Sequence, residues 1–344
     1  MKFTYSPAHH EHAPAQIIVR GTLVPNLESP ARADALLAQL IAKGHEKVLP
    51  QGWDQKWIAA VHDAGYLEFL ETAHARWRQL PNATPLIHPH AFAHYSSRRR
   101  PKSIQGQVGY YLAGGSSPLA EGTWTASVGS AHAALEAARL VLGGEREAYA
   151  LCRPPGHHAY ADFGGGFCYL NNIAIAANYM ASQLGRVAIL DIDTHHGNGT
   201  QSIFYRRGDV HFVSVHGDPD VLFPFYAGYA DERGEGEGEG HNLNLPLPLK
   251  SEDPAWLGAI DEGMASIQAY RPSALLVSLG FDPFKGDPCS DLAVSTEGFR
   301  GAGERIGRYR GPVVLIQEGG YLVEKHGENL DAFLDGLMRA RSAA

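Results

Sequence analysis

One stretch, residues 187–201, restricts the possible folds of this chain more than any other. It begins with the apolar run Val-Ala-Ile-Leu and continues with aspartates, histidines and glycines. A short apolar run that ends in polar residues and glycine is typical of a parallel strand that is buried on both faces and leads into a loop. Open α/β sheets bind ligands beside the carboxyl ends of such strands, so we expect the chemistry of the chain there.

The polar side chains at the end of this strand indicate a metal site. Asp191, Asp193 and His195 are spaced by two, so they point to one side if the extended conformation continues. Two carboxylates and an imidazole on one side favour a divalent cation. The alternative is a solvated loop that contains acids, but such a loop gives no reason for strict alternation behind a buried strand.

Strands and helices alternate along the chain after residue 124. Apolar runs predict the strands, and helical spacing of apolar residues predicts the helices between them. The predicted strands are 148–152, 187–190, 210–215, 274–279 and 313–316, and the predicted helices are 127–142, 171–184, 199–206, 255–270 and 297–309. This alternation predicts an α/β fold with a mostly parallel sheet and helices on both faces.

The size and charge of the chain exclude several classes of protein. With 344 residues we expect a single domain over 1–344, although length alone also allows two. The net charge of −8 argues against a nucleic-acid partner, which needs a basic face. No segment approaches the ~18 apolar residues of a membrane span, and the first residues lack the apolar core of a signal peptide.

The three cysteines have no CxxC spacing, so neither a disulfide framework nor a structural zinc cluster is indicated. A reducing cytoplasm is therefore the expected location. Residues 82–122 form a long proline-rich segment with little periodicity. A loop of this length inside a compact domain usually has a function, and we expect it to act in binding or assembly.

Candidate chemical residues follow four of the predicted strands. Because parallel strands place their carboxyl ends on one edge of the sheet, we expect these side chains to meet in one crevice. They are His157 and His158, then Asp191, Asp193 and His195, then Asp282, and finally Tyr321. Each motif alone is weak, but four such ends on one edge indicate a catalytic site.

The residue types suggest a role for each side chain. Asp193, His195 and Asp282 supply two oxygens and one nitrogen and leave a position open for water, as catalytic metals require. Zinc is the leading choice, and carboxylate ligands would also accept Fe²⁺, Co²⁺ or Mn²⁺. The tandem histidines can accept the proton of a metal-activated water, and the Tyr321 hydroxyl can donate to an oxyanion. Together these groups indicate metal-assisted hydrolysis of an acyl bond.

Five motifs in these regions resemble a known fold. They are Arg-Pro-Pro-Gly-His-His, Gly-Gly-Phe-Cys-Tyr-Leu-Asn-Asn, Asp-Ile-Asp-Thr-His-His-Gly-Asn-Gly-Thr, Ser-Leu-Gly-Phe-Asp and Glu-Gly-Gly-Tyr. The set resembles the arginase–deacetylase fold and, within it, zinc-dependent deacetylases of the histone deacetylase type. The resemblance implies an eight-stranded sheet, zinc on Asp193, His195 and Asp282, and His158 as the general base.

The same resemblance implies roles for residues around the metal. Phe167 and Phe223 would form the walls of a tunnel for the acyl chain, and the Gly166 carbonyl would lie near the substrate nitrogen. A structural K⁺ is also implied, with Asp191 and Ser214 as matching side chains.

The residues behind the tandem histidines are implied in the same way. Asp191 would orient His157. Asn198 stands behind His158, where some relatives have an aspartate.

A finer resemblance is to bacterial acetylpolyamine amidohydrolases. It rests on segments 21–25, 61–67, 105–111 and 122–124. In that subfamily the long insert, here about residues 82–122, closes a homodimer and narrows the mouth of the active site. Those enzymes carry acidic side chains in the insert, whereas Gln105 and Ser116 occupy the matching positions here. No acidic residue lies between Pro81 and Glu121.

The expected function is therefore hydrolysis of the acetyl amide of a small acetylated amine, such as an acetylpolyamine or an acetylated diamine. A histone-type lysine deacetylase or another short-chain acyl amidohydrolase is the alternative within the same chemistry. An arginase-like ureohydrolase would need further acids for two metals, and Asp282 is followed by Pro283 and Phe284. A non-catalytic binding protein would be expected to lack Tyr321 or a metal ligand.

Overall fold

The computed structural model describes residues 1–93 and 99–343, and its centre is an eight-stranded sheet. All neighbouring strands of this sheet run parallel, in the order β4-β1-β5-β10-β9-β6-β7-β8. The predicted α/β fold and the eight strands are thereby confirmed. The strands are β1 (Lys2–Tyr5), β4 (Glu46–Val48), β5 (Glu147–Leu151), β6 (Val187–Asp191), β7 (Val210–Gly217), β8 (Asn242–Leu247), β9 (Ala274–Leu279) and β10 (Val313–Gln317).

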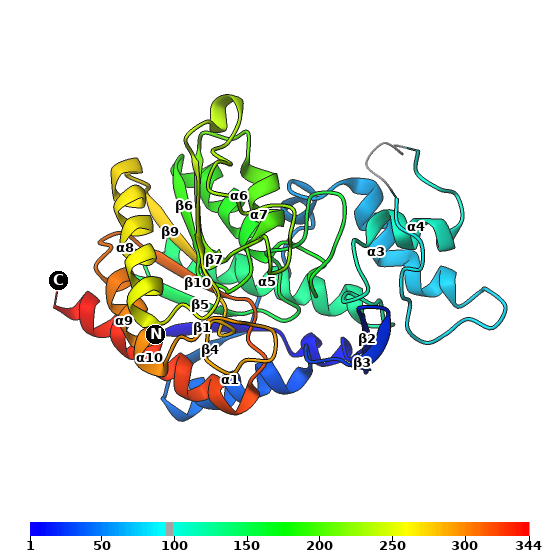
Figure 1. Cartoon of the computed structure of the whole chain (residues 1–344), viewed down its shortest axis with the longest axis horizontal. Helices are drawn as coiled ribbons and strands as arrows, with labels where there is room; N and C mark the ends of the chain where they lie inside the picture. The colour runs from blue at the N-terminus through cyan, green and yellow to red at the C-terminus, as the bar shows by residue number, and fades with distance from the viewer. Residues whose placement is uncertain (94–98, 344) are drawn as a thin grey trace.

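Helices cover both faces of the sheet (Figure 1). One hydrophobic core lies under α5 and α6, and the second lies under α1, α8, α9 and α10. The helices are α1 (Pro30–Ala42), α2 (Lys56–Ala59), α3 (Ala64–Trp77), α4 (Ile104–Tyr111), α5 (Thr123–Leu142), α6 (Asn172–Leu184), α7 (Asn198–Phe204), α8 (Asp253–Tyr270), α9 (Thr296–Gly307) and α10 (Val323–Ser342). Within the described residues, none of them is long and apolar enough to cross a membrane.

The position of β6 in the sheet explains why its sequence is apolar from Val187 to Leu190. Ile189 packs into the core under α5 and α6, while Ala188 and Leu190 pack into the opposite core. All five residues of the strand are buried. Since both faces of a central parallel strand are covered, an uninterrupted apolar run forms here in place of an alternating one.

Several elements differ from the predicted ones. Helix α5 begins at Thr123, four residues before the predicted start, and β7 continues to Gly217. Strand β8 lies at the sheet edge and was not predicted, because its sequence Asn-Leu-Asn-Leu-Pro-Leu contains a proline. Proline is tolerated on an edge strand, where one row of backbone groups has no partner strand. Helix α10 and the hairpin β2 (Gln16–Val19) and β3 (Thr22–Pro25) were also not predicted.

The insert 82–122 contains α4 and packs beside α3, at the end of the molecule where the β2–β3 hairpin also lies (Figure 1). The hairpin contacts the insert directly, because the Ile18 N–H donates to the Gly115 carbonyl over 3.0 Å. Residues 94–98 of the insert lie outside the described part of the chain. The assignment of residues 1–344 to one domain stays a prediction.

Candidate active site

The loop after β6 is shaped by turns. Strand β6 ends at Asp191, whose Oδ1 accepts the N–H of Asp193 over 3.1 Å. Oδ1 of Asp193 in turn accepts the N–H of His195 over 2.9 Å. The extended conformation therefore does not continue beyond Asp191, and the alternation argument does not apply to Asp193 and His195. Short polar side chains that bind the backbone two residues on favour turns, and these turns place Asp193 and His195.

The three predicted ligands converge beside this loop. His195 Nδ1 lies 3.2 Å from Asp193 Oδ1 and 3.1 Å from Asp282 Oδ2. Asp282 follows β9, the neighbour of β6 in the sheet. The three ligand atoms all lie within 4.8 Å of one another. Ligands about 2 Å from a tetrahedral zinc ion are separated by about 3.3 Å, so the spacing suits one cation.

Glycines make room for these ligands. A Cβ atom at Gly280 would lie 2.1 Å from Asp193 Oδ2, and one at Gly319 would lie 2.4 Å from Asp282 Oδ2. Any larger residue at either position would displace a carboxylate. The Gly319 N–H also donates to Asp193 Oδ2 over 2.8 Å. The close packing therefore determines where both carboxylates lie.

The electrostatics of the cluster favour a bound cation. Burial, followed by the nearby Asp193 carboxylate, raises the pKa of Asp282 to about 7. Burial also acts to raise the pKa of Asp193, but His157 and His195 outweigh it and lower that pKa. Two buried carboxylates side by side repel each other unless positive charge lies between them. Two oxygens and one imidazole nitrogen are a donor set that zinc, Fe²⁺, Co²⁺ or Mn²⁺ accepts.

The tandem histidines have different partners. His157 Nδ1 lies 2.9 Å from Asp191 Oδ2, whereas His158 Nδ1 lies 2.7 Å from Asn198 Oδ1. The Asn198 amide nitrogen donates to the Tyr160 hydroxyl over 3.3 Å, which leaves its oxygen as the acceptor for His158. Asp191 therefore lies beside His157 and Asn198 beside His158, as predicted.

These partners give the two imidazoles opposite protonation. Burial acts to lower the pKa of His157, but Asp191 and Asp193 outweigh it and raise that pKa to about 10. Burial lowers the pKa of His158 well below its ordinary value, and the neighbouring His157 and His195 lower it further. The surroundings of His157 therefore favour the charged imidazolium, whereas those of His158 favour the neutral imidazole. A pair of groups whose environments separate their pKa values is typical of catalytic sites.

Glu318 supports the backbone of the tandem histidines, although it is not among the residues predicted from the sequence. It is fully buried, and its Oε2 accepts the N–H groups of Gly156 and His157 over 2.7 and 3.1 Å. Its Oε1 accepts the Ser278 hydroxyl over 3.2 Å. Glu318 thus holds the backbone of the tandem histidines. An acid directly after the buried strand β10 is the signal that could have identified it.

Tyr321 lies between β10 and α10, and its side chain is buried beside two other groups. Its ring centroid is 5.4 Å from that of Phe167, and the Arg32 guanidinium carbon is 4.7 Å above the ring. Burial raises the pKa of Tyr321 well above its ordinary value, although Arg32 opposes this shift. The hydroxyl is therefore neutral and can donate a hydrogen bond. Arg32 also donates to the carbonyls of Glu318 and Gly320.

Two of the predicted substrate-binding residues, Gly166 and Phe223, lie against His158, and the third, Phe167, lies beside Tyr321. The Phe223 ring meets the His158 ring edge to face, with centroids 4.8 Å apart. Gly166 has a φ of +55°, and a Cβ atom there would lie 2.4 Å from His158 Cδ2, so glycine is required. Phe167 has a φ of +66°, and the Ser117 hydroxyl accepts its N–H over 2.9 Å. The structure thus brings all three predicted residues to the site.

The known proteins most informative for this geometry are histone deacetylase relatives. Residues 26–337 match the family model of the histone deacetylase domain. The chain belongs to the histone deacetylase family. It is 45% identical to acetylpolyamine amidohydrolase 1 of Pseudomonas aeruginosa over 98% of both chains. It is 44% identical to acetylpolyamine amidohydrolase of Burkholderia pseudomallei over 96% of this chain and 97% of that protein.

A solved structure of this family agrees with the fold. The crystal structure of acetylpolyamine aminohydrolase from Burkholderia pseudomallei superposes with a TM-score of 0.96 at 43% identity, and 99% of each chain is covered. The resemblance inferred from the motifs is therefore confirmed. As a member of the histone deacetylase family, the chain is an enzyme that hydrolyses amides.

Two residues expected to bind K⁺ lie side by side in this histone deacetylase fold. Asp191 and Ser214 occupy paired positions in β6 and β7. The Ser214 hydroxyl lies 2.8 Å from His216 Nδ1 and 3.2 Å from His196 Nδ1. Their adjacency is compatible with one cation, and the K⁺ assignment stays a prediction.

A second group of metal-ligating side chains lies on the outside of the histone deacetylase fold. His10 Nε2 lies 2.9 Å from Asp34 Oδ1, and His9 Nε2 lies 3.6 Å from the same oxygen. His9 Nδ1 is buried and has no hydrogen-bond partner in the described part of the chain. A metal-bound histidine usually donates its other ring N–H to an acceptor. The group is therefore better explained as a hydrogen-bonded pair with a neighbouring histidine.

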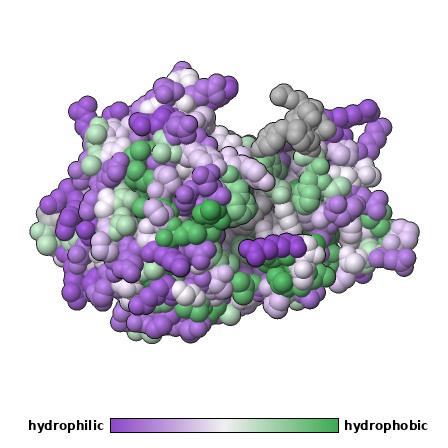
Figure 2. All heavy atoms as spheres, in the orientation of Figure 1, coloured by the Kyte–Doolittle hydropathy of each residue, from purple (hydrophilic) through white to green (hydrophobic). Residues whose placement is uncertain are grey.

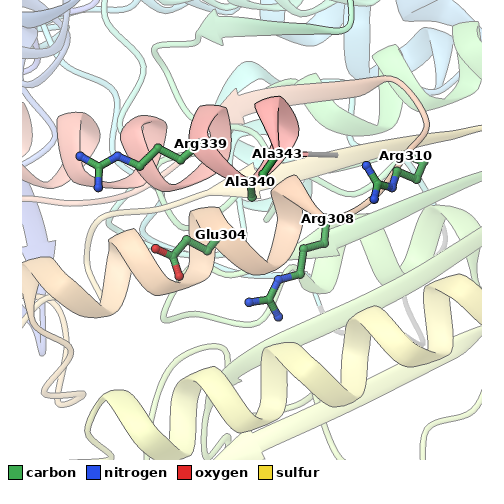
Figure 3. A pocket seen from close by; sticks show the side chains of 6 residues that line it. All are labelled: Glu304, Arg308, Arg310, Arg339, Ala340 and Ala343. Atoms are coloured by element: carbon green, nitrogen blue, oxygen red, sulfur yellow. The ribbon is translucent and has the colours of Figure 1, made fainter.

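A cavity of about 410 Å³ lies between the C-terminal ends of α9 and α10. The end of α9 leads into the amino end of β10, so this cavity is at the sheet edge opposite the ligands. Figure 3 shows that its arginine side chains extend in different directions. It therefore has no converging cationic site. Its lining residues are Glu304, Arg308, Arg310, Arg339, Ala340 and Ala343.

Proposed function

We propose that this enzyme removes the acetyl group from small acetylated amines, such as acetylpolyamines and acetylated diamines, to give acetate and the free amine. The observation that carries the proposal is the cluster of Asp193, His195 and Asp282 beside His158 and Tyr321. The names and near-complete coverage of the relatives support the substrate class. A histone-type lysine deacetylase with the same site is the second candidate.

In this proposal Asp193, His195 and Asp282 hold a zinc ion. Bound there, zinc would polarise the substrate carbonyl and lower the pKa of a coordinated water to roughly 7. The oxygen-rich ligand set also suits Fe²⁺, Co²⁺ or Mn²⁺. Asp191 and Ser214 would hold a structural K⁺ between β6 and β7.

His158 is proposed as the general base. An amide oxygen only accepts hydrogen bonds, so the contact with Asn198 Oδ1 requires the proton of His158 on Nδ1. Nε2 then keeps its lone pair and can take the proton of the attacking water. The same nitrogen can return the proton to the leaving amine. His157, held as a cation by Asp191, orients the neighbouring water and supplies positive charge.

Tyr321 is proposed as the donor to the oxyanion. Its hydroxyl stays protonated in its buried position, and charge on the substrate oxygen develops only in the transition state. The Gly166 carbonyl can accept from the substrate N–H. Phe167 and Phe223 would flank the acyl group and exclude water from it.

The insert 82–122 is proposed to close a homodimer and to narrow the mouth of the site. A narrow mouth admits a slender amine and obstructs a folded protein. Because the insert carries no acid between Pro81 and Glu121, a second ammonium group of the substrate gains little binding energy there.

Figure 2 shows a mostly hydrophilic face with hydrophobic patches near its middle. Val221, Phe225 and Tyr226 are exposed apolar residues near Phe223 in the sequence.

A substrate comparison tests this proposal. The kcat/KM of zinc-loaded enzyme is measured for N-acetylputrescine, N-acetylcadaverine, a neutral N-acetylalkylamine and an acetylated histone. We expect the three small amides to agree within about tenfold, since an exposed charge pair contributes only about 1 kcal/mol, and the histone to be poor.

Three results of this substrate comparison would change the proposal. A preference for the histone would overturn the small-amine assignment. A preference of about 10³-fold for one diamine over the neutral amide would show that an acid outside the insert binds the distal ammonium group. Turnover of guanidines such as agmatine, without turnover of any acetyl amide, would replace the proposal by a ureohydrolase.

A further inference from the structure

The loop after the ligand Asp282 contains a second buried aspartate, Asp287. Its side chain is 4% exposed and accepts three backbone hydrogen bonds. Oδ2 accepts the N–H of Tyr321 over 2.6 Å and the N–H of Leu322 over 3.0 Å. Oδ1 accepts the N–H of Cys289 within its own loop over 2.9 Å. One carboxylate thus ties the loop of Asp282 to the backbone of Tyr321.

The backbone around Tyr321 needs such an acceptor. Strand β10 ends at Gln317 and helix α10 begins at Val323, so the N–H groups of residues 321 and 322 lie outside regular structure. Gly320 has a φ of +111°, which places the Tyr321 backbone in a turn that side chains rarely permit. A buried N–H without a partner costs about 1–3 kcal/mol, and Asp287 satisfies two of them.

The turn that begins at Asp287, residues 287–290, also contacts the ligand loop after β6. The Ser290 and Thr194 hydroxyl oxygens are 2.8 Å apart. Thr194 lies between the ligands Asp193 and His195, and its N–H donates to Asp282 Oδ1 over 3.1 Å. The 287–290 turn therefore touches the backbone of Tyr321 at one end and the ligand loop at the other. Its geometry sets the distance between these two parts of the site.

We propose that Asp287 is a positioning residue that holds the Tyr321 hydroxyl at its place relative to the metal ligands, an inference that rests on the proposed donor role of Tyr321. If Asp287 acts through Tyr321, its loss lowers kcat and leaves KM unchanged. In a Tyr321→Phe background, where the Tyr321 hydroxyl is absent, loss of Asp287 should cause no further fall in kcat. A carboxylate that only stabilises the fold would produce neither pattern.

A double-mutant cycle tests the proposal on zinc-loaded enzyme. The variants are Asp287→Ala, Tyr321→Phe and the double variant, with Asp291→Asn as a matched control on an exposed side chain of the same loop. We measure kcat and KM for an acetylated diamine, zinc content and thermal stability. We expect Asp287→Ala to lower kcat by about 30-fold with KM within about twofold, and the double variant to be as fast as Tyr321→Phe. Asp291→Asn should match the unsubstituted enzyme.

A conservative variant separates positioning from folding. Asp287→Asn keeps one oxygen for the N–H groups of Tyr321 and Leu322 but cannot also accept from Cys289. We expect its kcat to lie between those of the unsubstituted enzyme and Asp287→Ala. It also replaces Asp287→Ala in the cycle if the alanine variant does not fold.

The outcomes that overturn the inference are distinct from those that overturn the proposed function. Multiplicative losses in the double variant, or loss of zinc from Asp287→Asn, would show that Asp287 does not act through the hydroxyl. Normal turnover of Tyr321→Phe would instead refute the donor role itself, whatever Asp287 does.

Discussion

His195 and Asp282 each supply one of the three ligand atoms proposed for the zinc ion. We therefore expect His195→Ala and Asp282→Asn to lose zinc and activity together, because two remaining protein ligands hold a cation poorly. The measurement is zinc per chain by elemental analysis, alongside turnover. His10→Gln, which alters an exposed histidine of the second group, should keep its zinc. Full zinc occupancy in an inactive His195→Ala enzyme would contradict the ligand assignment.

Tyr321 contributes a donor to charge that develops in the transition state. Tyr321→Phe should therefore keep zinc and KM but lower kcat by about 10²-fold or more. Steady-state kinetics on an acetylated diamine, with zinc analysis of the same sample, check this expectation. Near-normal turnover would mean that Tyr321 has a structural role and that another group binds the oxyanion.

At the scale of elements, the insert 82–122 is connected to the wall of the site. The N–H of Ala113 donates to the Gly164 carbonyl over 2.8 Å, and the Tyr169 hydroxyl donates to the Pro118 carbonyl over 2.6 Å. Ser117 accepts from Phe167 between these two contacts. The insert thus holds the segment that carries Gly166 and Phe167 in their left-handed conformations.

Removal of the Ser117 hydroxyl should loosen the segment that carries Gly166 and Phe167. Ser117→Ala leaves the Phe167 N–H without its acceptor, which costs about 1–3 kcal/mol where the group stays buried. We expect KM for an acetylated amine to rise by about fivefold or more with a smaller change in kcat, whereas Ser117→Thr keeps the hydroxyl and the KM. Equal kinetic constants for the alanine and threonine variants would show that the insert does not position the wall.

At the scale of the whole molecule, buried neutral histidines should make the fold sensitive to acid. Burial lowers the pKa values of His12, His62 and His211 to about 4. Since the unfolded chain binds these protons near pH 6.5, the free energy of unfolding should fall as the pH falls from about 6.5 to about 4. Above pH 6.5 the three histidines are neutral in both states and contribute no pH dependence.

One variant tests this contribution directly. His62 Nε2 accepts the N–H of Asn171 over 2.9 Å, and glutamine at this position keeps an acceptor without a titration. Urea unfolding of the metal-free unsubstituted protein and of metal-free His62→Gln is measured at about pH 7.5 and about pH 5. The difference between the two pH values gives the loss in the free energy of unfolding for each protein. We expect the loss to be smaller by about 2 kcal/mol in His62→Gln. Identical losses would show that the His62 pKa is not depressed.

The repeating pattern of the sequence was sufficient to predict the arrangement of the core. Largely apolar runs such as 187–190 and 274–279 predicted central parallel strands, because a strand that is buried on both faces carries few polar side chains. Edge elements followed weaker patterns and were missed, as β8 with its proline shows. The convergence of Asp193, His195 and Asp282 could be predicted because each follows a predicted strand, and parallel strands share one carboxyl edge.

Residue order alone thus determined the fold class and the sheet edge at which the candidate residues gather, and it predicted the metal ligands, since these inferences depend on local periodicity and residue chemistry. The tertiary structure decided which side chains position those residues. Glu318 beneath the tandem histidines and Asp287 behind Tyr321 act through backbone N–H groups, which any sequence carries equally. An acceptor from a distant loop leaves no local pattern, because only folding brings it within hydrogen-bonding distance of the N–H groups that it satisfies.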